Sequence, residues 1–171
     1  MEDRNKTALR DREIVRIVET YSDMLMRIAL NRVNSIAEAE DVVQTTFERM
    51  LRRQPHFMTR EHEKAWLIKT AIRICIDEAR KNAHRTSIPL NEEITAAYSE
   101  ESFELLETIR TLPEKDRDAV YLYYYEEYST AEVAKILGER EGTTRSRLSR
   151  ARQKLKALRE GEAYEQVLEG I

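Results

Sequence analysis

The sequence predicts an all-α protein built from two small helical domains, and three observations support this prediction. Only four of the 171 residues are glycine and three are proline. Apolar residues recur at helical spacing, and no alternating apolar run indicates a β-strand. Residues 86–108 contain no lysine or arginine but several glutamates, which is typical of an acidic linker. We therefore expect domains at residues 10–85 and 105–160, joined by a linker at 86–104.

The first domain should begin with a helix whose apolar stripe runs from Ile14 to Ala29. Ser35 and Glu38 have the S-x-x-E spacing of a capping box, so a second helix is expected to start there. This second helix directs mostly apolar residues inward: Ala39, Val42, Val43, Thr46, Phe47, Met50 and Leu51.

The outward face of the second helix carries three polar residues that have two interpretations. They are Asp41, Gln44 and Glu48. The face is either solvated, with Glu48 paired to Arg52 four residues further on, or a docking surface for another protein. Periodicity alone favours the solvated face.

A loop at residues 54–59 and a third helix, from about Arg60 to Asn82, complete the first domain. Pro55 ends the preceding helix and begins the loop. The polar side of the third helix gathers a tryptophan among charged residues: Trp66, Lys69, Arg73, Asp77 and Arg80. Trp66 is either packed under another helix or an aromatic surface for unstacked bases, with cations beside it for phosphates.

The second domain is expected to open with a helix from about Ser102 to Arg110. Pro113 suits the first turn of the next helix, which extends through apolar residues to Tyr124. We interpret the tyrosines between Tyr121 and Tyr128 as core and interface packing rather than as chemical groups.

The last two predicted helices form a helix-turn-helix candidate. Ser129 and Glu132 predict a capping box, and Gly138 can take the positive φ that ends a short helix. From about Glu141, a second helix places five residues on its core side: Thr144, Leu148, Ala151, Leu155 and Leu158. Its opposite side carries small or hydrogen-bonding residues: Gly142, Ser146, Ser149, Arg150 and Gln153.

The charge of this last helix indicates a polyanionic partner. Eight lysines and arginines and one acidic residue lie between Arg140 and Arg159, in a chain whose net charge is −3. Short polar residues bordered by cations suit base-edge reading with phosphate contacts on either side. The alternative is a solvated basic helix in an ordinary helical hairpin. The bordering cations are Arg145, Arg147, Arg152, Lys154 and Lys156.

Several classes of function are disfavoured by the composition. A single cysteine, Cys75, rules out an internal disulfide and fits a reducing compartment. No signal core is present and no apolar run reaches the roughly 18–20 residues of a membrane span, so we expect a soluble, cytoplasmic protein without membrane insertion. The histidines lack metal-ligand spacing, and no nucleotide-binding or nucleophile motif occurs. We expect no catalytic residue, no metal and no cofactor, and therefore no enzyme.

Four motifs in order resemble those of the extracytoplasmic-function (ECF) group of bacterial RNA polymerase sigma factors. Residues 39–47 read AEDVVQTTF, similar to the AED-x-x-Q-x-x-F helix of that family. Residues 66–81 resemble its WL-x-x-x-A…D-x-x-RK helix, and residues 112–117 its LPE-x-x-R sequence. Residues 137–152 are similar to its LG-x-x-EGT-x-x-SRL-x-RAR helix-turn-helix. The resemblance covers about residues 14–158.

The resemblance implies a two-domain factor that binds core RNA polymerase and directs it to a promoter. It implies that Asp41, Gln44 and Glu48 dock on the clamp helices of the β′ subunit, and it adds the β flap as a polymerase contact. This assignment replaces the solvated interpretation of that face. Many relatives are also held by an anti-sigma factor, which adds a candidate partner.

The resemblance also implies two DNA contacts. The loop around Phe57 and the helix after it would bind the opened −10 strand and hold a flipped base, whose extrusion costs roughly a few kcal/mol. The −10 residues are Phe57, Trp66, Arg73 and Arg80. The helix-turn-helix would read the −35 element in the major groove. The −35 residues are Arg145, Ser146, Arg147, Ser149, Arg150 and Gln153.

Some positions depart from the family pattern. Relatives usually have asparagine where Arg73 stands, which implies an altered or more electrostatic −10 preference. Glu139 occupies a turn position that is usually aliphatic, and Thr144 a buried position that is usually valine. Arg140 is a poor helix cap. These changes predict a weaker helix-turn-helix core with its basic outer face retained.

Two other classes of function compete with the sigma factor. A helix-turn-helix repressor or activator that acts without polymerase should dimerise and bind a palindromic duplex alone. This chain shows no dimerisation helix. A helical protein-binding module would instead show little salt-dependent affinity for DNA.

Overall fold

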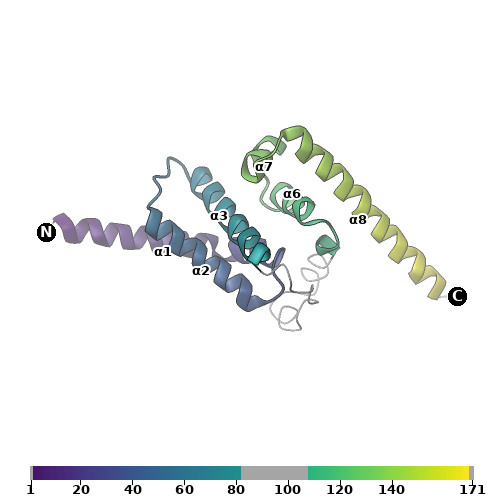
Figure 1. Cartoon of the computed structure of the whole chain (residues 1–171), viewed down its shortest axis with the longest axis horizontal. Coiled ribbons are helices and arrows are strands. Elements are labelled where there is room, and N and C mark those ends of the chain that lie inside the picture. Colours follow the sequence, from purple (N-terminus) through teal and green to yellow (C-terminus); the bar gives the residue numbers. More distant parts are fainter. Residues whose placement is uncertain (1, 82–107, 170–171) are drawn as a thin grey trace. The chain divides into compact units, whose positions relative to one another are not determined.

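The computed structural model describes residues 2–81 and 108–169, and Figure 1 shows its helices. The chain divides into two compact units, Met1–Leu90 and Asn91–Ile171. Every regular element in the described ranges is a helix, which confirms the all-α prediction. The predicted linker at 86–104 lies outside the described residues.

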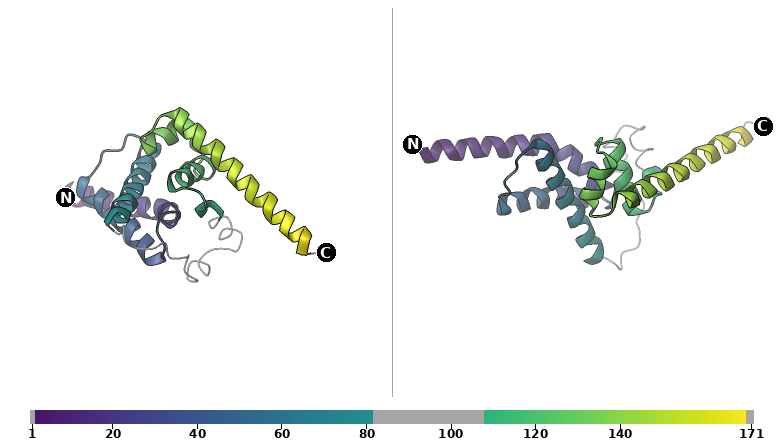
Figure 2. Two further views of the ribbon diagram at one scale, coloured as in Figure 1. Left: turned by 45° about the vertical axis from the view of Figure 1, so that its right-hand side comes forward. Right: turned by 90° about the horizontal axis from the view of Figure 1, so that it is seen from above.

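Residues 2–81 of the first unit form three helices, α1 (Glu2–Leu30), α2 (Ile36–Arg53) and α3 (Arg60–Lys81). Each helix contacts the other two, and the N-terminal part of α1 extends beyond α2 and α3 (Figure 2). Leu25 and Leu67 are both 0% exposed. Burying a leucine side chain contributes about 1.5–3 kcal/mol, so the apolar sides of these helices hold the bundle together.

The ends of α2 follow from local chemistry. The side chain of Ser35 accepts a hydrogen bond from the Glu38 N–H at 3.2 Å, as the capping pattern predicts. The Glu38 carboxylate accepts from the N–H of Asn34 at 3.1 Å, one residue beyond the cap. The helix ends where Gln54 adopts the left-handed conformation (φ 47°) and donates to the Met50 carbonyl at 2.8 Å.

Two details of α2 differ from the predictions. Leu51, expected on the inward side, is 41% exposed. The loop that follows α2 leaves a hollow beside the last turn of the helix instead of covering it. Glu48 accepts a hydrogen bond from Gln44 at 2.9 Å, so its partner in the described part of the chain is Gln44 rather than Arg52.

In the described residues of the second unit, the main helices are α6 (Glu114–Tyr124), α7 (Thr130–Leu137) and α8 (Glu141–Glu169), and each contacts the other two. Residues 108–110 are helical, and the rest of the helix predicted at 102–110 lies outside the described residues. The backbone of α8 continues well past the predicted end of the domain (Figure 1).

The core of the second unit forms where α6 meets the other two helices. Leu122 of α6 is 1% exposed and Val133 of α7 is 0% exposed. Pro113 is the N-cap of α6, one position before the first turn in which it was expected. It contributes no side-chain hydrogen bond there, so its fixed φ is its main contribution to starting the helix.

The tyrosines at the end of α6 divide between the core and the surface. Tyr121 is 5% exposed, whereas Tyr123, Tyr124 and Tyr125 are 37%, 47% and 43% exposed. Consecutive helical positions are about 100° apart, so these residues cannot all face one core. Core packing is confirmed for Tyr121, whereas the three exposed rings lie outside the core and their packing at an interface stays a prediction.

Both predicted boundaries of α7 are confirmed. Ser129 and Glu132 form a complete capping box, with hydrogen bonds of 3.3 Å and 2.9 Å. Gly138 takes a φ of 69° and closes the helix with its N–H on the Ala134 carbonyl. The next helix begins at Glu141, as predicted. These signals fix the short turn between α7 and α8.

Candidate nucleic-acid interface

One side of α8 is buried and the opposite side is exposed. Thr144, Leu148 and Ala151 are at most 3% exposed and pack into the unit. A Cβ atom built at Gly142 would meet no atom within 4 Å, so the first turn of α8 is open to a partner. The exposed side carries the small and hydrogen-bonding residues: Gly142, Ser146, Ser149, Arg150 and Gln153.

Arg145 borders this exposed side and is held beside Glu141. Its guanidinium donates to Glu141 Oε1 at 2.6 Å, and Thr130 of α7 donates to the same oxygen at 2.7 Å. The bonds from Thr130 and Arg145 lower the pKa of the Glu141 carboxyl. The Arg145 side chain is still 68% exposed. A phosphate can replace its partner readily, because exposed ion pairs contribute only about 0–1 kcal/mol.

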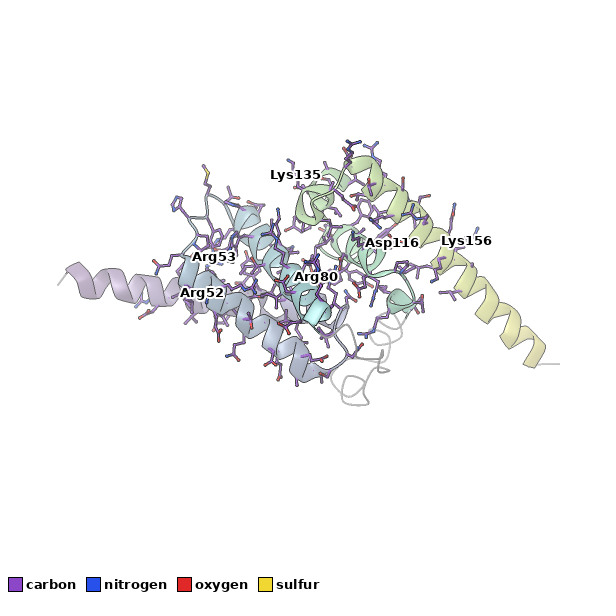
Figure 3. All side chains as sticks on the ribbon, in the orientation of Figure 1. Arg52, Arg53, Arg80, Asp116, Lys135 and Lys156 are labelled. Atoms are coloured by element: carbon purple, nitrogen blue, oxygen red, sulfur yellow. The ribbon has the colours of Figure 1, made fainter. Side chains whose placement is uncertain are left out.

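Arg147 is turned into the unit instead of toward solvent. Its Nη1 donates to Asp116 Oδ1 at 2.8 Å and its Nε donates to Glu139 Oε2 at 2.9 Å. The side chain is 17% exposed. Burial opposes the charge, but the bonds to Asp116 and Glu139 outweigh it and raise the pKa of Arg147. The structure thus separates Arg147 from the exposed members of the predicted −35 set; Figure 3 labels its partner Asp116.

Glu139 and Thr144, the two departures in the helix-turn-helix, are bonded to each other. The Thr144 hydroxyl donates to Glu139 Oε1 at 2.8 Å, and Thr144 is 0% exposed. The second carboxylate oxygen of Glu139 receives the bond from Arg147. The polar groups that replace aliphatic side chains here therefore have partners, which opposes the weakening that the departures predict.

The remaining cations of the second unit have different environments. Lys154 Nζ donates to the Thr111 carbonyl at 2.5 Å and ties α8 to the segment before α6. Arg152 Nε donates to the carbonyl of Leu148 at 3.4 Å. Lys135 is exposed on α7 and adds a cation from the first helix of the pair (Figure 3).

In the first unit, the loop between α2 and α3 brings Phe57 against Trp66. The ring centroids are 5.9 Å apart at an interplanar angle of 66°, and Phe57 also meets His62 at 5.8 Å. Both Phe57 and Trp66 are half-buried, whereas Met58 is 83% exposed. Trp66 is thus neither fully packed under a helix nor fully exposed, and part of its ring remains available to a ligand.

A hollow of about 520 Å³ lies beside this loop, and Leu51, Pro55 and Phe57 contribute to its apolar lining. Its charged wall is neutralised internally. Arg16 donates to both carboxylate oxygens of Glu63, at 2.8 Å and 2.7 Å, and the Glu63 side chain is only 4% exposed. The hollow therefore offers apolar contacts beside the paired charges of Glu13 and Arg60, and its apolar part suits a flat aromatic group.

A second concavity, of about 430 Å³, lies between α2 and α3 and is rich in arginine. We call it the arginine groove. Asp77 is the only carboxylate in its lining, and within the described residues none of its arginine side chains has a hydrogen-bond or ion-pair partner. Figure 3 labels Arg53 and Arg80, which come from the two sides of the groove. The lining residues are Arg49, Arg53, Thr70, Arg73, Ile76, Asp77 and Arg80.

Sequence reasoning selected two of these arginines, Arg73 and Arg80, and missed Arg49 and Arg53. The four-residue spacing of Arg49 and Arg53 was a usable signal, because residues four apart share a helix face. That this face borders α3 is a tertiary fact. The groove therefore concentrates more positive charge than the sequence predicted.

The predicted docking face is exposed on α2. Asp41, Gln44 and Glu48 are all exposed, while Ala39 and Val42 of the same helix are 0% and 3% exposed. The hydrogen bond from Gln44 to Glu48 orients both side chains along the helix. The face thus presents an amide and two carboxylates on a rigid element.

Residues 2–81 and 108–169 contain neither a cluster of metal ligands nor a membrane-spanning helix. No group of three or more His, Cys, Asp or Glu side chains in these ranges is arranged to hold a metal ion. None of the helices described there combines the length and apolar character that crossing a membrane requires.

Two protein-family models match the chain, one in each unit. Sigma-70 region 2 matches residues 17–85, and Sigma-70, region 4 matches residues 102–155. The first match includes the docking face, the loop and the arginine groove. The second includes α7 and the exposed small and hydrogen-bonding residues of α8.

Curated relatives extend the similarity over most of the chain. The ECF RNA polymerase sigma factor SigM of Bacillus subtilis is 30% identical over 155 residues, which cover 83% of this chain and 92% of SigM. SigW of the same species is 29% identical over 159 residues, or 82% of this chain and 85% of SigW. BldN of Streptomyces coelicolor is 30% identical over 148 residues, and the match spans 80% of this chain but 56% of BldN.

Solved structures share the fold. The sigma factor RpoE of Bartonella quintana, in complex with the anti-sigma factor NepR, matches with a TM-score of 0.68 and 23% identity over 88% of this chain and 96% of that chain. CnrH, in complex with the cytosolic domain of CnrY, matches with a TM-score of 0.67 and 22% identity over 88% and 90%. Because regions 2 and 4 are both present and SigM matches nearly end to end, the chain belongs to the ECF RNA polymerase sigma factors.

Proposed function

We propose that this sigma factor binds core RNA polymerase and directs it to promoters that carry two separated elements. Residues 10–85 bind the polymerase and open the −10 element, residues 105–160 read the −35 element, and residues 86–104 link the two. The observation that carries the proposal is the pairing of regions 2 and 4 on one chain, with the base-reading side of α8 exposed. The protein acts in the cytoplasm and performs no chemistry itself.

The exposed face of α2 is the proposed contact with the β′ clamp helices, and the β flap is the second polymerase contact. The amide and carboxylates of the α2 face suit a basic or polar partner helix. The double variant Asp41→Ala with Gln44→Ala should weaken core binding about tenfold, because truncation at the centre of an interface typically costs about 1 kcal/mol or more. The melting temperature should not fall, because both side chains are exposed. Glu19→Ala, an exposed carboxylate on α1, is the control. Unchanged affinity of the double variant for core polymerase would contradict the assignment of the docking site to this face of α2.

The −10 strand is proposed to bind at two features of the first unit. A flipped base enters the hollow beside the loop and stacks on the Phe57–Trp66 pair. Stacking of a base on an aromatic ring is worth about 1–3 kcal/mol, which offsets the cost of extrusion. The phosphates lie in the arginine groove, where Arg73 adds a cation in place of the usual asparagine. Contact with the −10 strand is therefore strongly electrostatic.

The −35 element is proposed to lie against the exposed side of α8. Arg145 and Arg150 supply guanidinium groups at its border and centre, and small residues between them allow close approach of base edges. Arg147 is not part of this surface, because its guanidinium is bonded inside the unit. The proposed −35 contacts are Arg145, Ser146, Ser149, Arg150 and Gln153.

An anti-sigma factor is a proposed regulatory partner. RpoE, which shares this fold, was solved with the anti-sigma factor NepR, and CnrH was solved with the cytosolic domain of CnrY. Co-purification of the full chain with its bound partner from the native cell would test this part of the proposal. A chain that elutes free of any partner except core polymerase would contradict it.

Run-off transcription from a library of randomised templates tests the main proposal. Purified core polymerase with this protein should enrich templates that share two elements at a fixed spacing, and core polymerase alone should not. The enriched sequences then define the −10 and −35 elements. Absence of stimulation, together with salt-sensitive binding of a palindromic duplex by the protein alone, would favour the repressor.

A further inference from the structure

Four polar side chains of the second unit form one continuous hydrogen-bonded chain, which we call the Arg147 cluster. Thr144 donates to Glu139 at 2.8 Å, and Arg147 donates to Glu139 at 2.9 Å and to Asp116 at 2.8 Å. The side chains of Arg147, Asp116 and Glu139 are 17%, 8% and 15% exposed. These residues come from α6, from the turn before α8 and from α8, so the cluster ties the turn and α8 of the helix-turn-helix to α6.

Asp116 also faces a second arginine. Nη2 of Arg150 lies 3.9 Å from the same Asp116 oxygen that receives Arg147. Arg150 is 60% exposed and belongs to the side of α8 that is proposed to read bases. One carboxylate oxygen therefore stands between an internal cation and a surface cation. A guanidinium held near its bound position loses less conformational freedom on binding, which favours affinity for the matching base.

We propose that the Arg147 cluster is a positioning device for −35 recognition. Asp116 and Glu139 hold Arg147 between α6 and the turn, which fixes how α8 is seated on the unit. Asp116 in turn holds the Arg150 guanidinium over the base-reading side. Arg147 itself makes no DNA contact. This inference rests on the proposed reading of −35 DNA by α8.

Asp116→Asn in the full chain, bound to core polymerase, tests the proposal. Affinity is measured for a duplex with the −35 element selected by the wild-type holoenzyme and for a duplex of equal composition with that element scrambled. The discrimination ratio is the Kd for the scrambled duplex divided by the Kd for the selected duplex. We expect this ratio to fall about fivefold or more, because a bidentate arginine contact gives about tenfold discrimination or better. Affinity for the scrambled duplex should not fall. Glu127→Gln makes the same chemical change at an exposed carboxylate of this unit and should keep the wild-type ratio.

Variants of Arg147 separate positioning from direct contact. Arg147→Lys keeps the charge but loses the planar fork that joins two carboxylates, so it should lower the ratio as Asp116→Asn does. In Arg147→Gln, the dependence of log affinity on log salt for the scrambled duplex should keep its wild-type slope. A slope reduced by about 0.9 would show that Arg147 binds a phosphate and would overturn the proposal.

A double variant, whose folding is checked by thermal unfolding, distinguishes a loss of positioning from a loss of folding. Glu139→Leu with Thr144→Val replaces a bonded polar pair by an apolar pair, an exchange that can be nearly neutral for stability. We expect it to fold and to discriminate less, because Arg147 loses one partner. If this variant and Asp116→Asn both keep the wild-type ratio of Kd values, the positioning role of the cluster is overturned, while the proposed −35 function of α8 stands. A wild-type holoenzyme that does not discriminate between the duplexes would instead remove the proposed −35 function, and this inference with it.

Discussion

The two surfaces that are proposed to meet DNA, the arginine groove of the first unit and α8 of the second, hold their arginines in opposite ways. The four arginine side chains of the arginine groove have no partner within the described residues. In the second unit, Arg145, Arg147 and Arg150 each lie within 3.9 Å of a carboxylate oxygen. Both units are basic where they are proposed to meet DNA, yet only the second orients its cations with acidic neighbours.

This difference corresponds to two physical tasks. Unpaired cations attract phosphates whatever the base sequence, so the groove should supply affinity that falls steeply with salt. Paired guanidinium groups are oriented before they bind, so α8 should supply discrimination between base pairs. The comparison therefore assigns electrostatic strand binding to the first unit and sequence reading to the second.

The largest expected effect is on the sequence-reading side. Arg150→Ala should remove about 1–3 kcal/mol of discrimination between the selected and the scrambled −35 element, because it deletes a central guanidinium. Affinity for the scrambled duplex should change much less. Footprinting of the holoenzyme on both duplexes measures the two affinities. Equal losses on both would show that Arg150 touches only phosphate and would break the comparison.

The next effect separates base contacts from phosphate contacts within the first unit. Trp66→Ala should slow or weaken open-complex formation by about 1–3 kcal/mol, the typical contribution of one stacked base. Closed-duplex binding should stay near the wild-type level. Permanganate reactivity of unpaired thymines reports the opening, and thermal unfolding is the control. A lowered melting temperature with normal opening would make Trp66 a packing residue.

The smallest effect uses two adjacent arginines of α2. Arg53 lines the arginine groove and Arg52 does not, although both are exposed. Arg53→Gln should reduce the slope of log affinity against log salt by about 0.7 on a template with a single-stranded −10 region. Arg52→Gln, the matched control, should leave that slope unchanged. Equal slopes in the two variants would contradict the assignment of phosphates to the groove.

Local signals in the sequence predicted the helix boundaries well. Ser35 and Ser129 start helices because their side chains satisfy backbone N–H groups a few residues away. Gly138 ends α7 because its positive φ needs no tertiary support. The buried side of α8 followed from its spacing for Thr144, Leu148 and Ala151, whereas Leu155 and Leu158 are only half-buried. Each of these features depends on residues that are close in sequence.

The features that were missed depend on residues that are far apart in sequence. Leu51 is exposed because the following loop leaves a hollow, and Arg49 with Arg53 form a groove only because α3 lies beside them. Arg147 seemed to flank the exposed side of α8, but Asp116, 31 residues earlier, holds it inside the unit. Helical periodicity gives the direction of a side chain and not the neighbour that it meets.

Transcription from two templates tests the central claim most directly. The templates carry the selected promoter and the same promoter with a scrambled −35 element, and each is transcribed over a range of salt. Arg150→Ala holoenzyme should show a preference for the selected promoter that is reduced about fivefold or more. Arg49→Gln with Arg53→Gln should keep the wild-type preference and lose activity as salt rises. A groove variant that loses the preference, with an Arg150→Ala holoenzyme that keeps it, would contradict the account.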